Sequence, residues 1–342
     1  MKTAPVHILA LRFSALGDVA MTVPVLKSVL AQHPQLQITM VSIPFHAPLF
    51  EGIDRLHFYG VDIKKDFKGI PGLMRLARKL KTGIRFDAVA DLHDVLRTKI
   101  IRRFLGAVPI AVIDKGRKEK KELTRPKNKK LRPLPPTFER YAAVFRKLGI
   151  QVQLTVADGL LPAPLRSAAT NIPPQPFAVG IAPFAKHAAK MYPAEKMKEV
   201  IRQLQADRNL QLFLFGSRTE APLLQQWAGD AENITVVAGT CSFKEELQLI
   251  AKMNVILTMD SANMHLASLY GVPVVSVWGG THPYLGFYGW GQDPDNAVQT
   301  DLPCRPSSVF GNKPCPVHGA AGCMQEITPG MIVDQIKKNL YS

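Results

Sequence analysis

Residues 255–278 read VILTMDSANMHLASLYGVPVVSVW and specify a parallel α/β unit. The two ends, 255–259 and 274–278, are apolar and rich in β-branched residues, as strands buried on both faces of a parallel sheet are. Asp260 and Ser261 are typical N-cap residues and Gly271 is a typical C′ residue, so the pattern predicts a helix of about ten residues between the strands. A strand, a helix and a strand in this order form a βαβ unit.

The start of the predicted helix is a candidate site for an anion. Its first backbone N–H groups have no helical partners, and together with the macrodipole they suit a diphosphate. Because every βαβ unit has such a cap, a purely structural role for Asp260 and Ser261 is an open alternative. His265 lies one turn into the helix, where it either faces a ligand or is a buried core histidine.

Strand and helix patterns alternate along the rest of the chain. They predict strands at 7–12, 38–43, 86–92, 177–182, 210–215 and 234–237. Helices are expected at 18–31, 69–82, 95–105 and 138–148, after Pro193, and from Ser242, whose Glu245 completes a capping box. Residues 160–176 are rich in Pro and Ala and predict a linker. The expected fold class is α/β, with two Rossmann-like, doubly wound parallel-sheet domains that face a common cleft. The domains are expected at 1–165 and 176–342, and the last helix either stays with the second domain or packs on the first.

Composition places the chain among globular proteins. It has 342 residues, of which 46% are hydrophobic and 20% charged, which excludes global disorder. No apolar stretch is long enough to cross a bilayer, and the run that ends at Arg12 is too short for a signal peptide. Four cysteines do not make a disulfide framework in a chain of this length. These features predict a cytoplasmic protein and leave its oligomeric state open.

Half of the net charge of +16 lies in one segment. Residues 115–132 contain ten Lys or Arg and two Glu, together with Pro126, and predict an exposed, mobile basic loop. Such a loop is either a solvated surface or a contact for a partner rich in phosphate or carboxylate, which includes nucleic acid and an anionic membrane. No aromatic residue occurs in it before Phe138, which argues against single-stranded nucleic acid.

Several polar residues follow the predicted strands. The first turn, Ser14-Ala15-Leu16-Gly17-Asp18, lacks the Gly-x-Gly-x-x-Gly pattern, so a dinucleotide is not expected there. Asp18 is either a helix cap or a general base at the end of the first strand. In the second half, Lys190 is either a surface lysine or a contact for a phosphate oxygen. Glu220 is placed to accept from ribose hydroxyls, and Gly280 with Thr281 offers close backbone approach and a hydroxyl group.

These motifs resemble those of a known family. Ser14-Ala15-Leu16-Gly17-Asp18-Val19, Lys190-Met191-Tyr192-Pro193, Asp260-Ser261-Ala262-Asn263-Met264-His265-Leu266-Ala267 and Gly279-Gly280-Thr281-His282-Pro283 are similar in order and spacing to the motifs of glycosyltransferase family 9. That family comprises the ADP-heptose:lipopolysaccharide heptosyltransferases. Asp91-Leu92-His93 with Arg97-Thr98 is similar to a further, weaker family pattern. The resemblance runs from about Ile8 to the C-terminus.

The resemblance implies a GT-B enzyme that transfers a heptose with inversion, without a cofactor or a metal. Asp18 would be the catalytic base, and Lys190 would neutralise the diphosphate of the leaving ADP. The implied donor site comprises Lys190, Glu220, Asp260, Ser261, Ala262, His265, Gly280 and Thr281. The implied acceptor contacts are Ser14, Gly17, His93, Arg97, Lys115 and Lys120. The implied partners are an ADP-sugar donor and an anionic glycolipid acceptor at the cytoplasmic face of the inner membrane, with peripheral attachment and no nucleic acid.

Two motif positions depart from the family pattern and leave the donor sugar open. Ser261-Ala262 stands where many members have Thr-Gly, and His282 replaces a frequent acidic residue. Transfer from another nucleotide-diphosphate sugar, a sugar-nucleotide epimerase and a non-catalytic nucleotide- or nucleic-acid-binding protein of the same fold remain alternatives.

A separate cluster near the C-terminus comprises Cys304, Cys315, His318 and Cys323. Three thiols and an imidazole suit a tetrahedral zinc site. The spacing is irregular and contains no Cys-x-x-Cys pair, so the sequence favours a structural loop with free thiols over a metal site.

Overall fold

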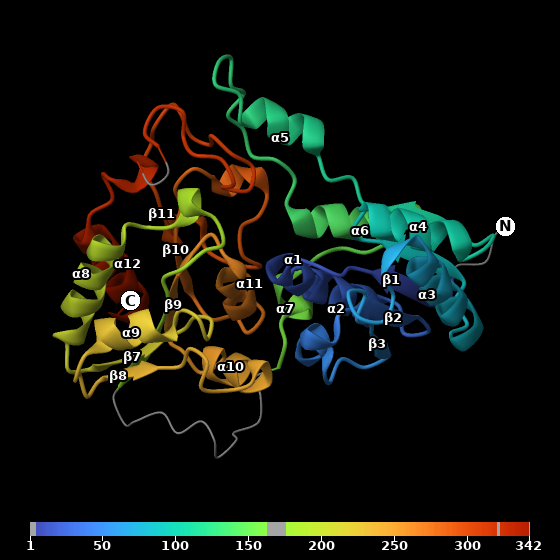
Figure 1. Ribbon diagram of the computed structural model, residues 1–342, viewed down its shortest axis with the longest axis horizontal. Helices are drawn as coiled ribbons and strands as arrows, with labels where there is room; N and C mark the ends of the chain where they lie inside the picture. Colours follow the sequence, from blue (N-terminus) through green and yellow to red (C-terminus); the bar gives the residue numbers. More distant parts are fainter. Residues whose placement is uncertain (1–4, 163–175, 320–321, 342) are drawn as a thin grey trace. The chain divides into compact units, whose positions relative to one another are not determined.

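The computed structural model describes residues 5–162, 176–319 and 322–341 (Figure 1). The chain forms two compact units. The first unit comprises Met1–Lys115 and Thr137–Leu160, and the second comprises Gly116–Pro136 and Leu161–Ser342. Most of the linker that the sequence predicts at 160–176 lies outside the described residues.

The first unit is built on a parallel sheet of five strands in the order β3-β2-β1-β4-β5. The strands are β1 (His7–Leu11), β2 (Gln37–Ser42), β3 (Leu56–Gly60), β4 (Ala88–Asp91) and β5 (Ile110–Val112). The helices are α1 (Leu16–Ala20), α2 (Thr22–Gln32), α3 (Gly69–Gly83), α4 (Leu96–Phe104), α6 (Thr137–Lys147) and α7 (Val156–Gly159), with a 3-10 helix η1 (Pro44–Phe50). Strand β1 lies in the middle of the sheet, where Leu11 pairs with Val41 and Asp91. The residues that follow β1 and β4 therefore emerge side by side at one edge.

The second unit is built on a parallel sheet of six strands in the order β11-β10-β9-β6-β7-β8. The strands are β6 (Phe177–Ala182), β7 (Leu210–Leu214), β8 (Ile234–Val236), β9 (Val255–Met259), β10 (Val274–Val277) and β11 (Ala297–Val298). The helices are α5 (Arg117–Leu123), α8 (Ala194–Gln205), α9 (Ala221–Ala228), α10 (Phe243–Ile250), α11 (Ala262–Ser268) and α12 (Pro329–Tyr341). Short 3-10 helices are η2 (Ala188–Lys190), η3 (Pro283–Leu285), η4 (Pro294–Asn296) and η5 (Gly322–Met324). The last helix, α12, packs on α8 and on β9, β10 and β11 of its own unit.

The βαβ unit predicted at 255–278 is confirmed as β9, α11 and β10. Every residue of both strands is buried, because helices cover the two faces of the sheet. The helix is shorter than expected and spans Ala262–Ser268. Gly271 follows it with φ of +69°, the left-handed conformation that a C′ glycine adopts without steric cost.

The basic segment 115–132 differs from the exposed loop that its charge predicts. Residues 117–123 form α5, in which Leu123 is fully buried and Lys120 is 6% exposed. Leu123 and Leu134 pack with Leu285 in a small apolar cluster. Residues 116–136, expected in the first domain, therefore belong to the second unit by their contacts.

Candidate functional site

Asp18 lies at the carboxyl edge of the first sheet and is held by an arginine. Its Oδ2 atom is 2.7 Å from Nη2 of Arg12, the residue directly after β1, and accepts from the backbone N–H of Ala15 at 3.3 Å. The Asp18 side chain is 31% exposed, whereas that of Arg12 is 7% exposed. The carboxylate is therefore fixed on one side by a buried cation and reaches solvent on the other.

Arg12 is itself held by the fold. Its Nη1 donates to the carbonyl oxygen of Leu92 at 2.7 Å, and its guanidinium lies 5.8 Å from the centre of the Tyr141 ring. The Tyr141 hydroxyl donates to the carbonyl oxygen of Asp18 at 3.1 Å. Sequence reasoning missed Arg12, although a lone cation at the end of a buried strand is a signal for a buried ion pair.

His93 stands beside Arg12 on the neighbouring strand end. Its Nδ1 accepts from the backbone N–H of Phe13 at 3.4 Å, and its own backbone N–H donates to Asp91 at 2.9 Å. Burial, reinforced by the positive charges of Arg12 and Lys115, lowers the pKa of His93 to about 3. The imidazole is therefore neutral at physiological pH, with Nε2 as the atom that carries the proton.

The other residues implied as acceptor contacts do not all gather around Asp18. Ser14 and Arg97 are exposed, and Gly17 and Lys115 are partly buried; Lys115 donates to the carbonyl oxygen of Asp94 at 3.1 Å. Lys120 belongs to the second unit, where its ammonium lies 3.9 Å from the centre of the Phe287 ring. This buried cation–π contact stabilises the packing of α5.

Three side chains meet at the carboxyl ends of adjacent strands in the second sheet. Lys190 follows β6, Asp260 follows β9 and Thr281 follows β10. The Lys190 ammonium is 2.7 Å from Oδ2 of Asp260, and the Thr281 hydroxyl donates to the same oxygen at 2.8 Å. The side chains of Lys190 and Asp260 are 15% and 4% exposed. The arrangement is a cation held by a buried carboxylate, at the edge where open α/β sheets bind ligands.

The loop after β10 is fixed by a buried arginine. The Arg305 guanidinium donates to the carbonyl oxygens of Gly279 and Thr281 at 2.6 and 3.0 Å, and burial lowers its pKa to about 10. The backbone N–H of Gly280 donates to Ala189, directly before Lys190, at 2.8 Å. These contacts join the loops after β6 and β10 into one frame around Asp260.

The remaining expected donor residues occupy the neighbouring strand ends. The Ser261 hydroxyl bonds with the Thr258 hydroxyl at 3.0 Å, Ala262 is the first residue of α11, and His265 is buried within that helix. Glu220 precedes α9 and accepts from the backbone N–H and hydroxyl of Ser217 at 2.6 and 2.8 Å. One oxygen of Glu220 is thus used to build its own turn.

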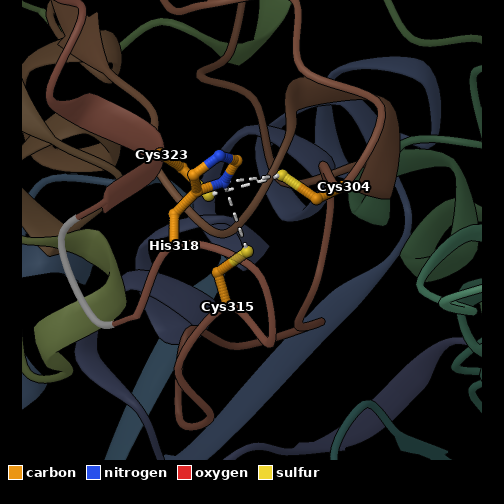
Figure 2. A group of neighbouring side chains, drawn as sticks. All are labelled: Cys304, Cys315, His318 and Cys323. Carbon is orange, nitrogen blue, oxygen red and sulfur yellow. Dashed lines mark hydrogen bonds between the residues drawn. The ribbon is translucent and has the colours of Figure 1, made fainter.

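The structure brings the side chains of the C-terminal cysteine and histidine cluster close together. The thiol sulfurs of Cys304, Cys315 and Cys323 and a ring nitrogen of His318 all lie within 4.8 Å of one another (Figure 2). The sequence favoured a structural loop with free thiols, and the thiols are free in the structure. The sequence did not show that the loop folds back on itself.

Among the described residues, no helix is both long and apolar enough to pass through a bilayer.

Comparisons with known proteins agree on one family. The model of glycosyltransferase family 9 (heptosyltransferase) matches residues 73–313. The sequence is 24% identical to lipopolysaccharide heptosyltransferase 1 of Pseudomonas aeruginosa over 318 residues, which cover 88% of this chain and 85% of that protein.

Solved structures show the same fold. A family 9 glycosyl transferase from Veillonella parvula has a TM-score of 0.77 at 17% identity, covering 98% of this chain and 97% of that one. The ADP-heptose lps heptosyltransferase II of E. coli has a TM-score of 0.69 at 20% identity, covering 98% of each chain. With its two parallel-sheet α/β units, the chain has the GT-B fold. Since the family model matches more than half of its residues, the protein is a glycosyltransferase that belongs to family 9, the heptosyltransferase family.

Proposed function

We propose that the protein transfers a heptose from ADP-heptose to a lipopolysaccharide core acceptor with inversion at the anomeric carbon. The observation that carries the proposal is the Lys190–Asp260–Thr281 group at the ends of three adjacent strands, in a chain related over 88% of its length to a lipopolysaccharide heptosyltransferase. A lysine held by a buried carboxylate at this edge suits a diphosphate.

The donor would bind to the second unit through its diphosphate. Asp260 and Thr281 orient the Lys190 ammonium, which neutralises the negative charge that develops on ADP as the glycosidic bond breaks. Lys190 would thus neutralise the charge on the leaving diphosphate, as a metal cation does in other transferases. The backbone N–H groups at the start of α11 add donors at the same strand end.

The acceptor hydroxyl would be activated by Asp18. Oδ2 of this carboxylate is engaged by Arg12 and the Ala15 N–H, so Oδ1 is the oxygen assigned to take the proton. The acceptor oxygen attacks the anomeric carbon as ADP leaves, and a single displacement of this kind inverts the configuration. Neutral His93, whose Nε2 carries a proton, is assigned a hydrogen bond to the acceptor.

The acceptor class follows from charge. Arg97 and the exposed lysines of residues 115–132 suit phosphate and carboxylate groups of a glycolipid core, at the cytoplasmic face of the inner membrane. Attachment there would be peripheral. Lys120 and Leu123 pack within the second unit, against Phe287 and Leu285, and have a structural role. The exposed lysines of the same segment would contact the acceptor.

The test is the coupling of ADP release to acceptor. The full chain is incubated with ADP-heptose, with and without a lipopolysaccharide core acceptor, and ADP is measured; release is expected only when both are present. A parallel reaction with ADP-glucose tests the alternative donor that the Ser261-Ala262 departure leaves open. Release without acceptor, or equal turnover of the two donors, would contradict the proposal.

Asp18→Asn tests the assigned base. Loss of general base catalysis lowers kcat by about 10² to 10⁴-fold. Binding of ADP, measured by calorimetry, should be unchanged because Asp18 belongs to the other unit. Asp54→Asn is the matched control, since Asp54 is an 87% exposed carboxylate of the same unit. Turnover retained by Asp18→Asn would show that another group accepts the proton.

A further inference from the structure

Residues 299–328, between β11 and α12, form a long segment with little regular structure. Of the residues described there, only η5 is helical, and a single backbone bridge joins Cys315 to Gly319. Loops longer than about 15 residues without secondary structure are uncommon in compact domains and are usually functional or disordered. Three of the four cysteines of the chain lie in this segment.

Four potential ligand atoms converge inside the segment (Figure 2). The distance from the Cys304 sulfur to Nδ1 of His318 is 3.4 Å, and to the Cys323 sulfur it is 3.9 Å. Nδ1 of His318 is also 3.9 Å from the Cys315 sulfur. The bridge between Cys315 and Gly319, with both backbone hydrogen bonds made, forms the tight turn that aims Cys315 and His318 at the same point.

These distances match the edges of a coordination tetrahedron. With Zn–S bonds of about 2.3 Å, the ligand atoms of a tetrahedral site lie about 3.8 Å apart. The three distances above range from 3.4 to 3.9 Å, and no pair of the four ligand atoms exceeds 4.8 Å. We propose that Cys304, Cys315, His318 and Cys323 bind one Zn²⁺ in a closed structural site.

The surroundings favour zinc thiolates. Three thiolates and one Zn²⁺ carry a net charge of −1, and two cations stand close by. Arg305 follows Cys304 directly and is buried, and the Lys129 ammonium donates to the carbonyl oxygens of Pro303 and Pro306 at 3.2 and 3.0 Å. The two cations stabilise the negative charge of such a site by Coulomb attraction.

A disulfide is the competing use of the same cysteines. The sulfurs of Cys304 and Cys323 are 3.9 Å apart and unbonded, and a bond between them would leave Cys315 and His318 without a role. The imidazole nitrogen, which lies 3.4 and 3.9 Å from two of the sulfurs, favours a metal over a disulfide. Three of the four ligands lie beyond residue 313, where the match to the family model ends.

The zinc would have a positioning role for the donor site. Cys304 directly precedes Arg305, whose guanidinium donates to the carbonyl oxygens of Gly279 and Thr281. The Thr281 hydroxyl in turn donates to Asp260. This step rests on the proposed function. The ion itself, with four protein ligands, has no open position for a substrate.

The metal content of the full chain is the direct test. Protein purified without a metal-affinity step is analysed by elemental mass spectrometry, and one zinc per chain is expected. Cys315→Ser and Cys323→Ser should each lose most of it, while Cys241→Ser, the remaining cysteine, retains it. X-ray absorption at the zinc edge should report three sulfur ligands and one nitrogen ligand. This readout needs no substrate, so it stands apart from the test of transfer.

A chelator titration covers the case in which the variants do not fold. Removing zinc from the wild-type protein should lower its Tm, and adding zinc should restore it. Iron in place of zinc would overturn the identity of the metal. An absence of bound metal, full zinc in Cys315→Ser, or a Cys304–Cys323 disulfide in freshly purified protein would overturn the site.

Discussion

Lys190 owes its position partly to a residue without a side chain. Gly311 has φ of +72°, and a Cβ atom there would lie 2.5 Å from Cγ and 3.1 Å from Cε of Lys190. The backbone of Gly311 thus packs directly against the aliphatic stem of the lysine. Because Asp260 holds the other end, the stem has little room to move aside.

Gly311→Ala is therefore expected to weaken donor binding. The new methyl group displaces the Lys190 ammonium from Asp260, and the KM for ADP-heptose should rise on the order of tenfold, the equivalent of about 1.4 kcal/mol. Steady-state kinetics at saturating acceptor measure this. The effect on kcat should be smaller than that of Asp18→Asn.

Gly52→Ala is the matched control for backbone strain. Gly52 has φ of +74°, and a methyl group added there would have no described atom within 4 Å, so the substitution imposes only the left-handed backbone cost of about 1–2 kcal/mol. An equal rise of KM in both variants would show that backbone strain, and not displacement of Lys190, weakens donor binding.

The candidate site was only partly predictable from single residues. Asp18, Lys190, Asp260 and Thr281 could be singled out because each lies in the segment that follows a strand, and these segments share the carboxyl edge of their parallel sheet. Their buried supports, Arg12 and Arg305, were missed, since what orders them is a set of carbonyl oxygens distant in sequence. The convergence of the four cysteine and histidine side chains could not be predicted for the same reason: it depends on how a loop returns on itself.

At the scale of elements, local patterns predicted most of the two sheets. The capping box at Ser242 and Glu245 is confirmed, with the Ser242 N–H donating to Glu245 at 2.7 Å. The helix expected at 18–31 is divided at Met21 into α1 and α2. Strands β3, β5 and β11 were missed, and each lies at an edge of its sheet. Helix α5 was missed because its charge hides the leucine that anchors it.

Helix α10 contains a partly buried carboxyl group, Glu246, whose charged form is disfavoured by burial. Burial raises the pKa of Glu246 from 4.5 to about 7. The folded state then binds more protons than the unfolded state between these values, so the stability that this group contributes is lost as pH rises through about 7. Glu246→Gln removes the loss and should stabilise the protein at pH 8.5 by about 1–2 kcal/mol, allowing for solvent screening.

Thermal unfolding at pH 5 and pH 8.5 checks this expectation. The gain in Tm from Glu246→Gln should be larger at pH 8.5. Glu245→Gln is the control on the same helix, because hydrogen bonds from Ser242 lower the pKa of Glu245, the opposite direction. Equal gains at both pH values would show that the Glu246 carboxyl titrates normally.

At the scale of the whole molecule, buried histidines in both units make the free energy of unfolding depend on pH. Burial lowers the pKa of His46 to about 4, and burial with nearby cations lowers the pKa of His93 to about 3 and of His282 to about 4. His46 and His93 belong to the first unit and His282 to the second. All three are neutral in the folded protein across the pH range in which unfolded histidine takes up a proton.

The free energy of unfolding is therefore expected to fall as pH decreases from 7.5 to 5. The unfolded state binds more protons in this range, so each histidine removes about 1–2 kcal/mol. Urea unfolding at the two pH values measures the sum, and the Glu246→Gln background removes the opposing contribution of that carboxyl group. His46→Asn, whose side-chain amide N–H can still donate to the Ser42 hydroxyl oxygen, should reduce the difference between the two pH values. A His46→Asn protein with the full wild-type difference would mean that His46 is already protonated or exposed when folded.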